Sequence, residues 1–139
     1  MLPDTGGVYV LGLRLLSPAT IRVLGRDVGL PAGRYVYIGS ARGPGGLRAR
    51  LGRHVRGDGR PRWHIDALRA VAEVEGLAYW IGDEVTECGV ACAVTALPGA
   101  TIPIPRFGAS DCRGGCPAHL IAVPSTLTLT EVAAVARPG

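Results

Sequence analysis

The sequence contains no lysine and no asparagine, and all 15 of its basic side chains are arginine. Aromatic residues make up only 5% of the chain and charged residues only 19%, whereas 47% of the residues are hydrophobic. This balance excludes a chain that is disordered throughout. A length of 139 residues fits one domain with a single hydrophobic core, which we expect to span residues 1–139. A GC-rich genome can explain arginine in place of lysine, so the positions of the arginines are more informative than their identity.

Two further absences concern membranes and secretion. No apolar run approaches the length of about 18 residues that a transmembrane helix needs. The N-terminal residues Met1–Asp4 are acidic rather than basic, unlike the start of a signal peptide. We therefore expect a cytoplasmic protein without a membrane partner. In that compartment the four cysteines should be reduced thiols or metal ligands rather than a disulfide framework.

The arginines are concentrated in one part of the chain. Residues 42–69, the arginine-rich segment, contain eight arginines against two acids, Asp58 and Asp66, so this segment has a net charge of +6 while the whole chain has +4. The guanidinium group offers five donors in a planar fork that suits phosphate oxygens. This concentration predicts a nucleic-acid partner, and an acidic protein surface is the alternative.

The pattern of hydrophobic residues predicts an α+β fold, in which a small mixed or antiparallel sheet is flanked by helices. The expected strands are residues 7–16, 20–24, 35–38, 73–81 and 118–123. The expected helices are residues 47–55, 63–72, 83–97, and a last one that begins at the capping box Thr128–Glu131. We expect the first two strands to pair as a hairpin, Asp83 to be the N-cap of the third helix, and residues 100–117 to form a loop.

Three short motifs occur in an informative order. Gly7–Tyr9 lies in the first expected strand, Tyr37–Gly39 ends the third, and the next helix carries Arg50 and His54 one turn apart on one face. In this order the motifs resemble the GIY-YIG nuclease superfamily over residues 6–95, with residues 100–139 as a C-terminal extension that contains cysteines.

Within that superfamily the chain is most similar to a little-characterised branch. The marks of this branch are YIGSA at residues 37–41, WHID at 63–66 and FGASDC at 107–112, and together they span nearly the whole chain. The branch is a domain of unknown function that is sometimes fused to endonuclease III-like glycosylases.

The resemblance implies a GIY-YIG-like core, from which this sequence departs by an extra N-terminal hairpin strand within residues 17–33. It also implies a metal-dependent endonuclease that acts on DNA rather than RNA, in DNA repair. Tyr9 would orient or activate the attacking water, with Tyr37 as its partner phenol. Arg50 would contact the scissile phosphate, and His54 would lie beside it. A DNA-repair glycosylase is the implied protein partner. The alternative for the two tyrosines is simple packing in the core.

The resemblance also implies one Mg²⁺ or Mn²⁺ ion held by a glutamate on a later helix. Glu87 is the best candidate here, with Glu84 as the second choice, although Glu87 could instead complement the helix dipole. The asparagine that accompanies this glutamate in the superfamily has no counterpart. This departure keeps open a second function, a nucleic-acid-binding module that has lost catalysis.

Residues around the expected site are candidates for nucleic-acid contacts. Arginines suit phosphates, a tryptophan can stack on a base, and a serine after a strand can donate to a phosphate. The candidates are Ser40, Arg42, Arg48, Arg53, Arg56, Trp63 and His64. For Trp63 and His64, packing against the core or capping of a helix is the alternative.

The cysteines suggest a second metal. Cys88, Cys112, Cys116 and His119 could complete a tetrahedral zinc shell, although their spacing is not that of a standard zinc ribbon. We expect Cys92, between two alanines, to lie in the core. The alternatives are buried reduced thiols and, for the whole chain, a zinc-stabilised protein-interaction domain.

Overall fold

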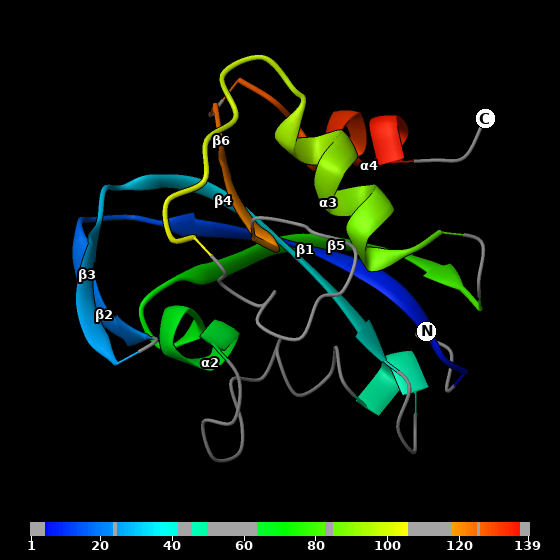
Figure 1. The fold of residues 1–139 in the computed structure, drawn as a ribbon, viewed down its shortest axis with the longest axis horizontal. Helices are drawn as coiled ribbons and strands as arrows, with labels where there is room; N and C mark the ends of the chain where they lie inside the picture. Colours follow the sequence, from blue (N-terminus) through cyan, green and yellow to red (C-terminus); the bar gives the residue numbers. More distant parts are fainter. Residues whose placement is uncertain are drawn as a thin grey trace.

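A computed structural model describes residues 5–23, 25–41, 46–49, 64–82, 85–105, 118–124 and 126–136. Its main element is a four-stranded sheet in the order β5-β1-β4-β6 (Figure 1). The strands are β1 (Gly7–Leu15), β4 (Gly33–Ala41), β5 (Glu73–Ile81) and β6 (Leu120–Val123). All of these pairings are antiparallel, and helices cover both faces of the sheet, so the fold is α+β as the sequence predicts.

The two central strands are buried on both faces. The residues Gly7–Leu13 are all buried, and β1 uses both of its edges, one for β4 and the other for β5. The expected hairpin between the first two strands is therefore wrong. A strand that is apolar on both faces belongs in the middle of a sheet, where long neighbours cover both edges. The five-residue β2 (Ala19–Val23) pairs instead with β3 (Arg26–Leu30) in a separate two-stranded sheet.

The helices divide between the two faces of the four-stranded sheet. Helices α3 (Glu87–Thr95) and α4 (Leu129–Ala136) lie on one side, and α2 (His64–Arg69) lies on the other (Figure 1). Residues 46–49 form a further helical turn. No helix within the described residues is long and apolar enough to cross a membrane.

Two helix starts follow from capping side chains. The Thr86 hydroxyl accepts a hydrogen bond from the amide of Gly89 at 2.9 Å, so Thr86 is the N-cap of α3. The prediction of Asp83 as N-cap is wrong, because α3 begins one turn later. The predicted capping box is confirmed: the Thr128 hydroxyl accepts from the Glu131 amide at 3.1 Å, and the Glu131 carboxylate accepts from the Thr128 amide at 3.3 Å.

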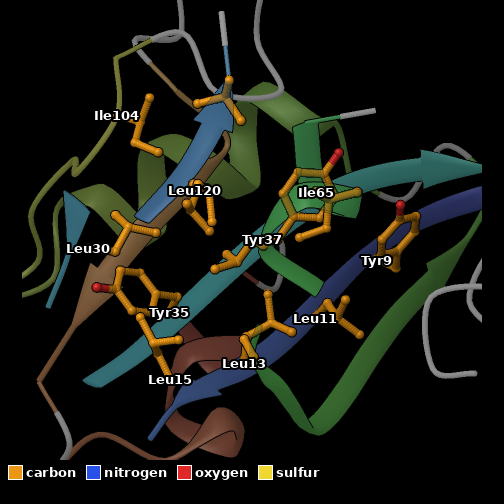
Figure 2. Close-up of a cluster of buried hydrophobic side chains, with 14 of the residues drawn as sticks. Tyr9, Leu11, Leu13, Leu15, Leu30, Tyr35, Tyr37, Ile65, Ile104 and Leu120 are labelled. Atoms are coloured by element: carbon orange, nitrogen blue, oxygen red, sulfur yellow. The ribbon is translucent and has the colours of Figure 1, made fainter. Parts of the chain in front are cut away.

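Alternation along the strands produces two separate cores. On the tyrosine face, defined by Tyr9, Leu11, Tyr35 and Tyr37, side chains of β1 and β4 pack with Leu30 and Ile65 (Figure 2). The opposite surface is the valine face, defined by Val8, Val10, Val36 and Ile38, which packs against α3 and α4. Successive residues of a strand point to opposite faces, so neighbours in the sequence belong to different cores.

Residues C-terminal to position 100 complete the sheet. β6 pairs with β4, with Leu120 opposite Tyr37, and Leu120 joins the core of the tyrosine face. Ile104, within the expected loop, is also fully buried in that core. The C-terminal extension therefore contributes an edge strand and core side chains to the same sheet as the two tyrosine motifs.

Candidate functional site

The two motif tyrosines lie together on the tyrosine face. Tyr9 of β1 is opposite Gly39 of β4, and Tyr37 is opposite Leu11, so the two rings are diagonal neighbours across one strand pair. Their ring centroids are 6.3 Å apart, and the ring planes are inclined at 50°. Both side chains are buried, Tyr9 fully and Tyr37 with 7% exposure. Adjacent antiparallel strands thus hold two phenols in one place.

The glycine of each tyrosine motif is required by a close contact. A Cβ atom on Gly39 would lie 2.5 Å from the Tyr9 hydroxyl oxygen and 2.6 Å from the ring carbon that bears it. A Cβ atom on Gly7 would overlap the backbone carbonyl oxygen of Trp80. Real Cβ contacts are not this short, so any larger residue would displace the Tyr9 ring or separate β1 from β5. The glycines therefore help to set the position of the tyrosine pair.

Within the described ranges, the core around the pair is apolar. Leu47 from the helical turn, together with Ile65 and Leu68 of α2, is fully buried in the same core. Low solvation in such a core strengthens the electrostatic interactions that a buried phenol makes.

A third tyrosine of this face has a different role. The Tyr35 hydroxyl donates to the carbonyl oxygen of Pro31 at 2.5 Å. Burial raises the pKa of this phenol above its ordinary value, because the anion would lose its hydration. Tyr35 therefore stays protonated and ties the start of β4 to the turn that precedes it.

The structure describes only part of the predicted cationic set. Arg48 is exposed on the helical turn, which the amide of Leu47 attaches to the carbonyl oxygen of Thr5 at 2.9 Å. The side chain of His64, at the start of α2, is outside the described residues. Also outside them are Arg42, Arg50, Arg53, His54, Arg56 and Trp63.

Two other predicted site residues lie on the opposite face. Ser40 pairs with Val8, which belongs to the core of the valine face, so its side chain points away from the two tyrosines. Glu87 is the first residue of α3, which packs on that same face. A magnesium ion held by Glu87 therefore does not fit a site shared with Tyr9 and Tyr37, because the sheet itself lies between them.

Glu87 lies instead beside a buried histidine. Its Oε2 atom is 3.1 Å from Nδ1 of His119, whose exposure is only 2%. The contact lacks hydrogen-bond alignment, and neither ring nitrogen of His119 has a hydrogen-bond partner within the part of the chain that the structure describes. The His119 carbonyl oxygen accepts from the Ile38 amide at 2.9 Å and so extends the pairing of β4 with β6. The structure thus joins two residues that the sequence assigned to different metal sites.

The cysteines differ from expectation. Cys88 is disulfide-bonded, so the prediction that the cysteines are reduced thiols or metal ligands is wrong for this residue. Cys92 is free and exposed rather than in the core, because the buried side of α3 is formed by Val90, Ala91 and Val94. No group of three or more metal-ligating side chains occurs among the described residues. Cys112 and Cys116 are not among them, and zinc binding stays a prediction for the reduced chain.

Sequence reasoning missed one aromatic residue of this face. Tyr79 of β5 is the cross-strand partner of Tyr9 and is partly exposed. The period-two pattern of Leu77, Tyr79 and Ile81 already suggested that these residues share one face of a strand. Only the register of β5 against β1 puts that face beside the tyrosine pair.

A family model described as "Domain of unknown function DUF123" matches residues 8–137. The match extends from β1 to the end of α4, so the chain belongs to this family. Searches of the curated proteins and of the solved structures found no match.

Proposed function

We propose that this chain is a DNA endonuclease of the GIY-YIG type. The observation that carries the proposal is the pair Tyr9 and Tyr37, one from each tyrosine motif, on adjacent strands with ring centroids 6.3 Å apart. The close approach of the Tyr9 ring to Gly39 supports it, because this contact gives the motif glycine a role in positioning the pair.

The roles of the side chains follow from what phosphodiester hydrolysis needs. An attacking water must be oriented and lose a proton, and cations must stabilise the charge that develops on the phosphate. We assign the orientation or activation of the water to Tyr9, with Tyr37 as its partner phenol. Arg50 contacts the phosphate, and His54 lies beside it. A free phenol has a pKa of about 10, so the arginine-rich segment must favour its anion for it to act as a base.

A divalent ion is part of the proposal, because Mg²⁺ or Mn²⁺ would supply Lewis-acid stabilisation of the phosphate oxygens. Glu87 is given no role in holding this ion, since α3 packs on the valine face. The net charge of +6 on residues 42–69 and the exposure of Arg48 support a polyanionic substrate. A repair context with a glycosylase partner rests on the resemblance alone.

The test is cleavage of branched, nicked and flapped DNA with Mg²⁺ or Mn²⁺. We expect the wild type to cut at least one of these substrates, and a Tyr37→Phe, Arg50→Ala double variant to lose that activity. Tyr35→Phe is the matched control, because it removes another buried phenol of β4 whose hydroxyl binds Pro31. Equal cutting by the wild type and the double variant would exclude the enzyme.

The second candidate is a nucleic-acid-binding module without catalysis. It is favoured by the position of Glu87 beside His119, on the face opposite the tyrosines. For such a module we expect nucleic-acid binding that weakens with salt, more steeply the more phosphates are neutralised. We also expect no cleavage with either metal. The same cleavage assay, run beside a binding assay, distinguishes the two.

A further inference from the structure

The edge strand β5 adds an exposed aromatic side chain to the tyrosine face. Tyr79 is directly opposite Tyr9, and directly opposed residues of an antiparallel pair point to the same face. Tyr79 is 36% exposed, whereas Tyr9 is fully buried. Ile81, the next residue on this face of β5, is 49% exposed. An open aromatic and an open aliphatic side chain thus lie beside the buried tyrosine pair.

The position of β5 makes Tyr79 accessible from the side. β5 is the first strand in the sheet order, with β1 on one edge. No strand pairs with its other edge in the described ranges. The partly exposed Tyr79 ring therefore lies on a strand at the edge of the sheet.

The acids of β5 lie in its first half. Glu73 is opposite Arg14, and Oε2 of Glu75 is 2.8 Å from Nε of Arg34, so both acids have cationic neighbours. Neither of them lies beside Tyr79.

A cation lies at this same end of the sheet. The carbonyl oxygen of Thr5 accepts from Leu47 at 2.9 Å, and that of Gly6 accepts from Gly82, just after β5, at 2.9 Å. The helical turn and the end of β5 are thus attached to consecutive residues of the chain. Arg48, the residue after Leu47, is exposed there. An exposed tyrosine and an exposed arginine at one end of a sheet are complementary to a base and its phosphate.

We propose that Tyr79 stacks on an unpaired base of the nucleic acid that this chain binds, while the phosphate backbone follows the side of Arg48. The inference rests on the proposed function and specifies its substrate class, a nucleic acid with a single-stranded segment next to the reacting phosphate. The bases of an intact duplex are already stacked on their neighbours, whereas every unpaired base offers its flat face to an aromatic ring.

The experiment measures binding of an oligothymidylate and of a duplex of equal length, by fluorescence anisotropy at several salt concentrations, without divalent metal. Tyr79→Ala should weaken binding of the single strand by about 5- to 150-fold, the usual effect of losing one stacked base. Tyr79→Phe keeps the ring and should bind within about twofold of the wild type. Val71→Ala, at another exposed apolar position near the start of β5, is the control and should change nothing.

Two readouts separate stacking from a structural role. The slope of affinity against salt should stay unchanged in Tyr79→Ala, because a phenol neutralises no phosphate. Binding of the duplex should also change less than about twofold. Equal single-strand affinity of Tyr79→Ala and wild type overturns the inference and leaves the proposed function standing. If the wild type binds neither nucleic acid, both fail. If Tyr79→Ala instead dissociates a dimer without affecting nucleic-acid binding, β5 contacts a second copy and the inference is wrong.

Discussion

The two faces of the four-stranded sheet are made by the same strands but differ in chemistry. The valine face carries aliphatic side chains such as Val8, Val10 and Val36, and two helices cover it. The tyrosine face carries three buried phenols among its leucines, with the exposed Tyr79 beside them. Aliphatic side chains can only pack, whereas buried phenols need hydrogen-bond partners and can act on a substrate. We therefore infer that both faces contribute packing, and that the proposed function depends on the tyrosine face alone.

The largest loss of stability is expected from a substitution on the valine face. Ile38 is fully buried there, and Ile38→Ala leaves a cavity in a close-packed core. We expect the free energy of unfolding to fall by about 2–5 kcal/mol, measured by urea denaturation. Ile38→Val, which removes one methylene, should cost only about 0.5–1.5 kcal/mol. Tyr37→Phe, one residue earlier on the other face, should keep the fold and lose the proposed activity.

A smaller effect is expected where the tyrosine face has no free space. In Gly39→Ala the new methyl group meets the Tyr9 ring at 2.5–2.6 Å, so the free energy of unfolding should fall by about 1–3 kcal/mol. Gly12→Ala in β1 is the control, because its Cβ would meet atoms no closer than 3.6 Å. Adding Tyr9→Leu to Gly39→Ala should recover part of the loss. If Gly39→Ala is as stable as Gly12→Ala, the contact between Gly39 and the Tyr9 ring does not fix the position of the tyrosine pair.

The smallest effect concerns Tyr35, whose hydroxyl binds the Pro31 carbonyl oxygen. Tyr35→Phe should lower the free energy of unfolding at neutral pH by about 0.5–1.5 kcal/mol. Burial raises the pKa of Tyr35 in the folded chain, so its contribution is fully present below the unfolded value near pH 10. The contribution is lost as the pH rises from there through the folded pKa. The stability difference between wild type and variant should therefore shrink in alkali, and a difference independent of pH would contradict this account.

Much of the local structure could be predicted from the sequence. The strand Glu73–Ile81 has the predicted bounds, and the capping box starts α4 where it was expected. The pairing of β1 could not be predicted, because the nearest strand in the sequence was not its partner. Local propensity identifies which residues form strands. Which strands then pair with each other depends on how the whole sheet buries its two apolar faces.

The candidate site divides in the same way. Tyr9 and Tyr37 were expected to meet, and they do, because both motifs lie in long apolar strands. The separation of Glu87 from them was not foreseen, because no local pattern tells which face of a sheet a helix will cover. Cys92 was misjudged for a related reason, since its alanine neighbours suggested a core position on a helix whose buried side was unknown.

The sequence by itself determined that the chain folds as α+β, that its positive charge gathers in residues 42–69, and that two glycine–tyrosine motifs occupy strands. These properties follow from the composition and from the spacing of hydrophobic residues along short segments of the chain. Only the tertiary structure decided that Tyr79 joins Tyr9 and that Glu87 joins His119. Strand register and the packing of a helix on a sheet bring together residues far apart in the chain, and their free energy comes from burying whole faces.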